Sequence, residues 1–216
     1  MMMQLAIAGG HGKVGQRLIR LLNARGDKVR SLDRNPDHAN DIRQAGAEPV
    51  TCDLESASME EVTEGIDRVD AVVFAAGAGP GSGSERKLTM DYGGAVKLIA
   101  AAKANGIKRY VMISSIGADP SAKGDDTFSV YLRAKGRADT ELQSSGLGYT
   151  IVRPTSLTDD PGTGRVQIAE HVEETSISRD DVAAVLAAVL HIPTTIGKTF
   201  EVTAGNVPVE QAIASL

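Results

Sequence analysis

The sequence predicts an α/β protein built on a doubly wound parallel sheet, with helices on both faces and therefore three layers. Short apolar runs rich in valine and isoleucine alternate with amphipathic stretches of helix length, which is the pattern of repeated β-α units. Strands of such sheets are buried on both faces and so read as apolar runs. The 216 residues, of which 42% are hydrophobic, can bury a sizeable core, and we expect one domain over residues 1–216.

The amino-terminal half is expected to contain four strands. The first strand, Leu5–Ala8, precedes a helix near Lys13–Ala24, where apolar residues recur at helical spacing. Gly26 suits the left-handed residue that ends such a helix. A second helix opens near Pro36, a residue type favoured in the first helical turn. The other three strands are expected at Val29–Leu32, Glu48–Thr51 and Ala71–Phe74.

The carboxyl-terminal half is expected to continue the alternation. The segment Pro154–Ser178 mixes proline, glycine, threonine and aspartate with little periodicity, which predicts an irregular substrate lid or, alternatively, a plain surface excursion. Expected helices are Leu88–Ala104, Phe128–Ser144, Asp180–Leu190 and Pro208–Ser215, and expected strands are Tyr110–Ile113, Thr150–Val152 and Thr199–Val202.

Composition excludes several classes of partner. The net charge of −5 and the lack of a basic run argue against nucleic acid. No apolar run approaches the ~18 residues of a membrane span, so we expect no membrane partner. The single cysteine, Cys52, excludes an internal disulfide, and the start Met1–Gln4 lacks a charged leader region. We expect a cytoplasmic monomer or homodimer that takes a small-molecule substrate.

The four histidines give no sign of a metal site. They stand at His11, His38, His171 and His191, without the spacing that metal ligands show. One cysteine cannot complete a zinc pattern. We therefore expect no metal and interpret the four side chains as structural or surface groups, with the His11 imidazole facing water.

A glycine-rich turn joins the first expected strand to the first expected helix. Gly9 suits a tight turn, Gly12 allows backbone to approach a pyrophosphate, and Gly15 allows close packing of the helix on the strand. Free N–H groups at the helix start then face the anion. A glycine-rich turn without a ligand is the alternative. The predicted dinucleotide contacts in this turn are Gly9, His11, Gly12, Lys13, Val14 and Gly15.

Two residues at the end of the second strand bear on the choice of dinucleotide. The Asp33 carboxylate would accept hydrogen bonds from a free ribose 2′-OH and repel a 2′-phosphate. Arg34 would attract that phosphate and stack on adenine, and Lys13 adds a second cation. NADP(H) is therefore favoured slightly over NAD(H). The alternative is that Asp33 and Arg34 form an ordinary solvated surface pair.

Further cofactor contacts are expected after the third and fourth strands. Asp53, followed by Leu54, could place a carboxylate against the adenine amino group, or could instead cap a short helix. The small residues of the run Ala75-Ala76-Gly77-Ala78-Gly79 would let the cofactor pass close to backbone.

Tyr131 and Lys135 lie one turn apart on an expected helix and so project from the same face. A lysine ammonium beside a phenol favours phenolate, which makes tyrosine a usable acid or base. Ser115, at the end of the fifth strand, could hydrogen-bond a substrate oxygen. A solvated surface pair is the alternative for Tyr131 and Lys135.

Together these residues resemble the short-chain dehydrogenase/reductase superfamily, specifically its atypical, small NAD(P)H-binding branch related to epimerases and dehydratases, with a Rossmann-type fold. The motifs that carry the resemblance are the glycine turn, Asp53-Leu54, Arg109–Ser115, Tyr131 with Lys135, Thr150–Pro154 and Asp180–Ala183. The resemblance implies Ser115, Tyr131 and Lys135 as catalytic residues, with Lys135 also on the nicotinamide ribose and Pro154 among the cofactor contacts.

The chain departs from the extended members of that superfamily in two ways. Asp91 stands where those relatives often have asparagine, which affects a proton relay or a structural contact there. The roughly 60 residues after Pro154 are too few for their larger substrate domain, which disfavours a bulky nucleotide-sugar. The sequence therefore predicts an NAD(P)-dependent oxidoreductase for a small carbonyl, alcohol or conjugated substrate. The alternatives are an NADP(H)-sensing regulatory protein and an enzyme like the sugar-nucleotide epimerases and dehydratases.

Overall fold

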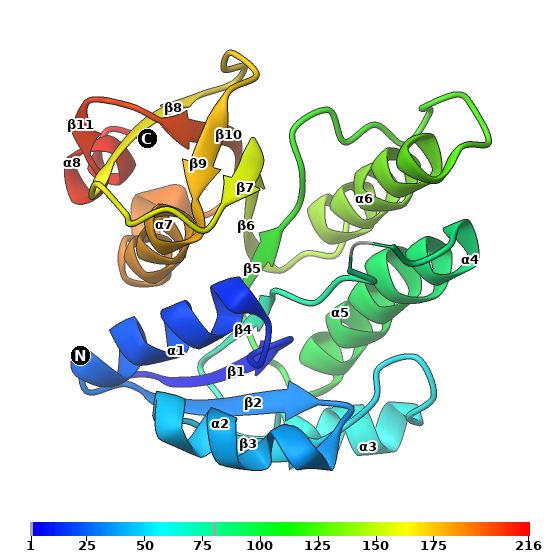
Figure 1. Ribbon diagram of the computed structural model, residues 1–216. Helices are drawn as coiled ribbons and strands as arrows, with labels where there is room; N and C mark the ends of the chain where they lie inside the picture. The colour runs from blue at the N-terminus through cyan, green and yellow to red at the C-terminus, as the bar shows by residue number, and fades with distance from the viewer. Residues whose placement is uncertain (1, 80) are drawn as a thin grey trace.

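A mostly parallel sheet forms the centre of the protein in the computed structural model, which describes residues 2–79 and 81–216 (Figure 1). Within those residues the strand order is β11-β8-β10-β6-β5-β4-β1-β2-β3. All neighbouring strands from β3 to β10 pair in parallel, whereas β8 runs antiparallel to both β10 and β11. The strands are β1 Gln4–Ala8, β2 Lys28–Asp33, β3 Glu48–Thr51, β4 Ala71–Phe74, β5 Arg109–Ile113, β6 Gly148–Pro154, β8 Arg165–Ala169, β10 Lys198–Ala204 and β11 Val207–Pro208.

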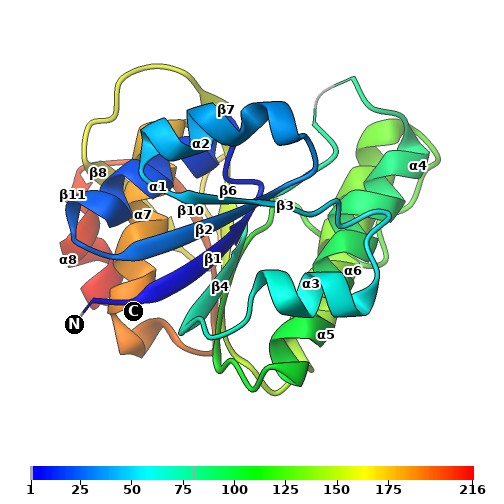
Figure 2. The ribbon, with the colours of Figure 1, turned by 90° about the horizontal axis from the view of Figure 1, so that it is seen from below.

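Helices cover both faces of this sheet (Figures 1 and 2). The helices α1, α2, α7 and α8 bury their apolar residues in one core cluster, and α3, α5 and α6 bury theirs in a second cluster on the opposite face. The predicted three-layer, doubly wound α/β architecture is therefore confirmed. The bounds are α1 Lys13–Ala24, α2 Ala39–Ala45, α3 Met59–Gly65, α4 Ser84–Arg86, α5 Ala95–Ala104, α6 Thr127–Gln143, α7 Arg179–His191 and α8 Val209–Ala214, with short 3₁₀ turns η1 Pro36–His38 and η3 Pro193–Thr195.

Local sequence signals explain where several helices begin. Ser58 and Glu61 form a reciprocal capping box at the start of α3. The Asp126 carboxylate accepts hydrogen bonds from two backbone N–H groups at the start of α6, and the Ser178 hydroxyl accepts one at the start of α7. Helix α1 differs, because Gly12 stands at its N-cap and supplies no side chain to its first N–H groups.

The segment expected to be an irregular lid contains more structure than the sequence indicated. Strand β6 continues to Pro154, and β7 (Ser156–Thr158) pairs in parallel with β9 (Ser176–Ser178) as a small separate sheet. Between them β8 joins the main sheet beside β10. The expectation of irregular structure is therefore wrong for β8, whose pairing depends on backbone hydrogen bonds that its weakly alternating side chains do not reveal.

The helix expected from Leu88 begins earlier, at Ser84, and is not uniform. After α4 the chain forms a π-helical stretch, η2 (Lys87–Gly94), and only then continues as α5. A π-helix is rare and occurs frequently at functional sites. This one turns the side chains of Lys87 and Asp91 inward, and both residues are buried.

None of the helices in the described part of the chain is both long and apolar enough to cross a bilayer.

Candidate functional site

A cavity of about 740 Å³ opens at the carboxyl ends of the parallel strands. It lies where the strand order reverses between β1 and β4, the place where open α/β sheets bind their ligands. The residues singled out from the sequence all line it except Gly15: Gly9, His11, Gly12, Lys13, Val14, Asp33, Arg34, Asp53, Leu54, Ala75, Ala76, Gly77, Ser115, Tyr131, Lys135 and Pro154. The structure thus brings them into one site, while their individual roles stay predictions.

The glycine-rich turn shows why glycine is needed. Gly9 has φ +85°, and a Cβ there would stand 2.7 Å from the Ala76 backbone. A Cβ on Gly15 would stand 2.3 Å from the Gly9 carbonyl oxygen, so Gly15 permits α1 to pack on the turn and does not itself line the cavity. With Gly12 at its N-cap, α1 presents uncapped N–H groups toward the cavity. Such a helix start fits the pyrophosphate of a dinucleotide.

Three cations around that helix start share one carboxylate. The Asp159 carboxylate accepts a short hydrogen bond from Lys13 Nζ, lies 3.0 Å from Arg179 Nη1 and 3.8 Å from Arg17 Nη2. The hydrogen bond from Lys13 is the main reason that the pKa of Asp159 is lowered. Lys13 and Arg179 both line the cavity. The loop after β7 is therefore tied to the turn at which phosphates would bind.

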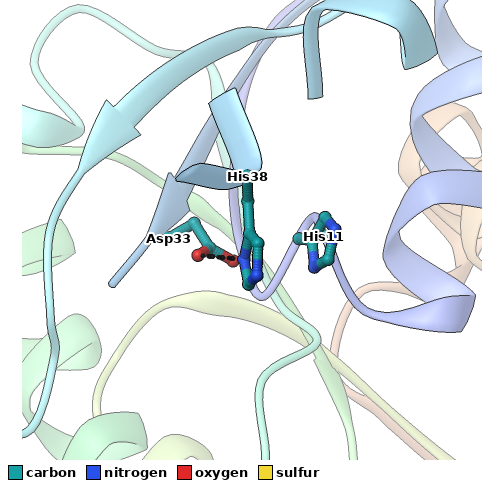
Figure 3. A group of neighbouring side chains, drawn as sticks. All are labelled: His11, Asp33 and His38. Atoms are coloured by element: carbon teal, nitrogen blue, oxygen red, sulfur yellow. Dashed lines mark hydrogen bonds and ion pairs between the residues drawn. The ribbon is translucent and has the colours of Figure 1, made fainter. Parts of the chain in front are cut away.

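A histidine pair occupies the end of β2 (Figure 3). His38 Nδ1 lies 2.8 Å from Asp33 Oδ1, and the His38 ring stacks on the His11 ring with centroids 3.5 Å apart and an interplanar angle of 13°. His11 Nε2 lies 3.1 Å from Asp41 Oδ2. The expectation that the His11 imidazole faces water is therefore wrong, because the pairing of β1 with β2 brings the two rings together.

His11, Asp33 and His38 each offer one ligand atom, and these atoms lie within 4.8 Å of one another. Two imidazoles and a carboxylate are a familiar ligand set for Zn²⁺. However, a ring nitrogen holds a metal close to its own ring plane, and these two planes are nearly parallel. An ion shared by both rings would lie between the planes, so we interpret the group as a hydrogen-bonded cluster.

Arg34 and Asp53 flank the same end of the cavity. Arg34 Nη1 lies 3.8 Å from Glu55 Oε2, and its side chain is about half exposed. The Asp53 carboxylate accepts hydrogen bonds from the Glu55 N–H and the Ser56 hydroxyl. Asp53 thus orders the loop after β3, and the cap of α3 is Ser58 and not Asp53.

Tyr131 and Lys135 occupy successive turns of α6 and face the cavity. Lys135 Nζ lies 5.9 Å from the centre of the Tyr131 ring, donates a hydrogen bond to the Ile113 carbonyl, and lies 3.3 Å from Asp91 Oδ1. Burial alone would lower the pKa of Lys135, but the charges of Asp91, Tyr131 and Asp139 outweigh it and raise the pKa. Lys135 is therefore a stable cation beside the phenol.

Two serines end β5 and differ in environment. The Ser114 hydroxyl is buried and donates to Asp139 Oδ2 at 2.9 Å, and Arg153 pairs with the same carboxylate. Burial raises the pKa of Asp139 in spite of these partners. The Ser115 hydroxyl donates only to the Ile116 carbonyl and lies half-buried in the cavity wall. Ser115 is thus the serine placed to meet a ligand.

The sequence did not indicate several residues of the cavity. Lys87 Nζ lies 5.3 Å from the centre of the Tyr131 ring and donates to the Gly79 carbonyl, so a second ammonium borders the phenol. The π-helical stretch that turns Lys87 inward has no periodicity signal in the sequence. The other cavity residues not foreseen are Leu32, Cys52, Arg86, Met90, Ile113, Ser114, Thr155, Leu157 and Arg179.

The fold and the cavity define the class: this is a dinucleotide-binding protein with a Rossmann-like sheet, glycine-rich turn and uncapped helix start. Residues 9–193 match the model of a family described as NAD(P)H-binding. The protein belongs to this family, and the predicted resemblance is confirmed.

Relatives extend the comparison over the whole chain. A Bacillus subtilis protein named "Uncharacterized sugar epimerase YhfK" is 38% identical, over 99% of this chain and 100% of its own. A solved Bacillus halodurans protein, provisionally called an NAD-dependent epimerase/dehydratase, is 39% identical with a TM-score of 0.92, over 99% and 100% of the two chains. The oxidoreductase ylbE of Lactococcus lactis is 28% identical with a TM-score of 0.85, over 99% and 96%.

Proposed function

We propose that the protein is an NAD(P)-dependent oxidoreductase acting on a small carbonyl, alcohol or conjugated compound. The observation that carries this proposal is the position of Tyr131, whose ring lies in the same cavity as the glycine-rich turn and close to the buried ammonium of Lys135. The likeness to ylbE, named an oxidoreductase, supports the reaction class. A cavity of about 740 Å³ has to hold dinucleotide and substrate together, which favours a small substrate.

The residues would divide the work as follows. The turn Gly9–Gly15 and the start of α1 would hold the pyrophosphate, and Asp33 and Arg34 would meet the adenosine ribose. A bound nicotinamide would supply or accept the hydride. Tyr131 gives its proton to the substrate oxygen in reduction and takes it back in oxidation. Lys135 favours the phenolate by its charge, and Ser115 orients the substrate oxygen.

A substitution of Tyr131 tests this proposal. Purified protein is given NADPH and a panel of carbonyls and quinones, and NADPH absorbance is followed. Tyr131→Phe should lose about 10²–10⁴-fold in turnover, the usual contribution of acid–base catalysis, with unchanged dinucleotide affinity. The matched control is Tyr92→Phe, because Tyr92 lies outside the cavity lining and its hydroxyl donates a hydrogen bond to Glu141. Equal turnover in Tyr131→Phe and the wild type would contradict the assigned role.

We also propose that NADP(H) is preferred over NAD(H). Arg34 supports this preference because its guanidinium lines the cavity and is held only loosely, 3.8 Å from Glu55. Arg34→Ala should weaken NADPH binding and leave NADH binding nearly unchanged. Arg20→Ala, an exposed arginine on α1, is the matched control. If calorimetry finds that the wild type binds NADH more tightly than NADPH, Asp33 and not Arg34 determines the preference.

A second candidate is a regulatory protein that senses NADP(H). Its support is Asp159, because Lys13 and Arg179 tie the loop after β7 to the phosphate-binding turn. Bound dinucleotide would compete for these cations and release the loop. Cofactor should then alter oligomeric state or partner capture even in Tyr131→Phe. A molar mass from light scattering and a pull-down result that are both unchanged by NADPH would exclude this role.

The name of YhfK raises a third candidate, a sugar-nucleotide epimerase or dehydratase. In the described part of the chain five strands and two α-helices follow Pro154. Three of these strands, β8, β10 and β11, complete the main sheet, which leaves little chain for a separate sugar site. We therefore rank it behind a small-substrate oxidoreductase. For partners and place we propose a cytoplasmic monomer or homodimer with a small-molecule substrate, without nucleic acid or membrane.

A further inference from the structure

His38, to which sequence analysis assigned no role at the site, contacts Asp33 and stacks on His11 (Figure 3). Asp33 and His11 line the end of the cavity where the adenosine ribose would lie. His38 belongs to η1, the single turn that follows β2. Its Nδ1 lies 2.8 Å from Asp33 Oδ1, and its Nε2 lies 3.2 Å from Asn35 Nδ2. The side chains of His38 and Asp33 are 32% and 14% exposed. Both side chains are thus largely sheltered from water, and of the two it is Asp33 that lines the cavity.

Asp33 is therefore not a free acceptor. Its Oδ1 accepts a hydrogen bond from the Asn35 N–H at 2.9 Å in addition to its contact with His38. A carboxylate at this position accepts from a ribose 2′-OH and repels a 2′-phosphate. Whether Asp33 acts as a full negative charge depends on whether His38 carries a positive one.

Other charged groups face the two rings and set the local balance. His11 stacks on His38 but has its own carboxylate, Asp41 on α2, at 3.1 Å. Arg34 follows Asp33 in the chain, and its Nη1 lies 3.8 Å from Glu55 Oε2. Each ring therefore has a separate anionic partner, and the charge that offsets Asp33 is that of His38.

We propose that His38 determines which nicotinamide dinucleotide is bound. With a charged imidazole, His38 cancels the Asp33 carboxylate and joins Arg34 in receiving a 2′-phosphate. With a neutral imidazole, the carboxylate keeps its full charge, repels the phosphate and accepts from the 2′-OH of NAD(H). The inference rests on the proposed dinucleotide site at this end of the cavity, and adds a residue that makes the preference depend on pH.

An imidazole changes charge within the physiological pH range, so the effect falls where binding can be measured. The preference for NADPH, expressed as the ratio of the Kd of NADH to that of NADPH, should decrease as pH rises from 5.5 to 8.5. We expect a decrease of about tenfold, which corresponds to about 1.4 kcal/mol. The 2′-phosphate also gains charge near pH 6, in the direction that favours Arg34. This second effect is common to all variants.

The experiment measures both Kd values by calorimetry across this pH range at constant ionic strength. His38→Gln should remove the decrease seen in the wild type, and His38→Lys should hold a high ratio throughout. Asp33→Asn should give a high ratio that does not decrease as pH rises. Asp37→Asn is the matched control, since Asp37 is exposed and adjacent in η1 but its carboxylate contacts neither ring. Circular dichroism checks that each variant is folded.

A second measurement assigns the effect to one ring. The His38 imidazole resonances, followed by NMR, should change at the same pH as the wild-type ratio of the two Kd values. His11→Gln should shift the midpoint of the NMR change and the midpoint of the ratio by the same amount. The proposal is overturned if His38→Gln keeps the wild-type pH dependence, or if His38→Lys and His38→Gln have the same ratio. Turnover enters neither measurement, so an inactive protein would reject the oxidoreductase proposal and leave this test intact. A wild type that prefers NADH at every pH would reject the NADP(H) preference only.

Discussion

Asp91→Asn tests whether the buried pair at the centre of the site has the energetic importance that its geometry indicates. Asp91 Oδ1 and Lys135 Nζ are 3.3 Å apart, with side chains only 2% and 5% exposed. Removal of one partner of such a pair costs about 3–5 kcal/mol, because the other charge stays buried. Asparagine keeps one oxygen, which can accept from either the Ala78 N–H or the ammonium, and this returns about 1 kcal/mol. We expect a loss of about 2–4 kcal/mol in the free energy of unfolding.

The sign of the pH dependence follows from the pKa of Lys135. In the wild type this pKa is raised, so the stability contributed by Lys135 is complete below the unfolded-state pKa and is lost as pH rises through the folded-state value. Without the Asp91 charge, which opposes the effect of burial, burial lowers the pKa of Lys135. The folded variant can then release the proton more easily than its unfolded state. The deficit of Asp91→Asn should therefore narrow as pH approaches about 10.4, the usual lysine value.

Urea denaturation followed by circular dichroism at pH 7 and pH 9.5 measures this deficit. Lys135→Met and the double variant complete a double-mutant cycle, and the double variant should be more stable than either single variant. Asp67→Asn is the control, because its partner Arg68 is 87% exposed and water screens the pair. A deficit below about 0.5 kcal/mol, or one that does not change with pH, would refute a strongly coupled pair.

Three further predictions concern packing and charge. Gly15→Ala should lower the free energy of unfolding by about 1–3 kcal/mol and weaken dinucleotide binding at least about tenfold, because its Cβ would stand 2.3 Å from the Gly9 oxygen. Equal melting temperature and affinity in Gly15→Ala and in the control Gly83→Ala, where space is open, would contradict this. Arg109→Met should lower the free energy of unfolding in urea by about 2–4 kcal/mol, because its guanidinium donates to four neutral acceptors that would lose this donor. Burial lowers the pKa of this guanidinium to about 10. A loss under about 1 kcal/mol would show that the acceptors find other partners. Asp159→Asn should lower the Kd of NADPH about two- to fivefold by releasing Lys13 and Arg179. The control Asp160→Asn should leave this Kd unchanged. A weaker affinity in Asp159→Asn would contradict the prediction and mean that the carboxylate stabilises the site.

The central parallel strands β1, β4 and β5 could be predicted because each is an apolar run, and burial on both faces leaves that mark in the sequence. Strand β8 left no such mark, since pairing beside β10 depends on its backbone. The π-helical stretch η2 could not be predicted either, because its eight residues make fewer than two turns and are too few to show a period. The glycine turn and the spacing of Tyr131 and Lys135 could be predicted because each pattern lies within a short stretch of the sequence.

The pairings that complete the site are long-range, and this separates what sequence could predict from what it could not. His38 reaches His11 across 27 positions, as the pairing of β1 with β2 requires, and Lys13 meets Asp159 from a distant loop. No spacing rule connects such residues. The sequence therefore identified the charged groups Lys13, Asp33 and Lys135 but not the partners that decide how much of each charge a ligand meets.

These partners change how affinity in this cavity should be interpreted. Lys13 is held by Asp159, Asp33 by His38, Lys135 by Asp91, and Arg34 more distantly by Glu55. A dinucleotide that binds here exchanges one partner for another, so its binding free energy is a difference between two sets of charge interactions. A substitution that weakens the internal partner is then expected to tighten binding where the ligand takes its place, as for Asp159. Where the internal partner orients the group that meets the ligand, as Asp91 does for Lys135, the same kind of substitution is expected to weaken function. The opposite signs predicted for Asp159→Asn and Asp91→Asn are a direct test of this distinction.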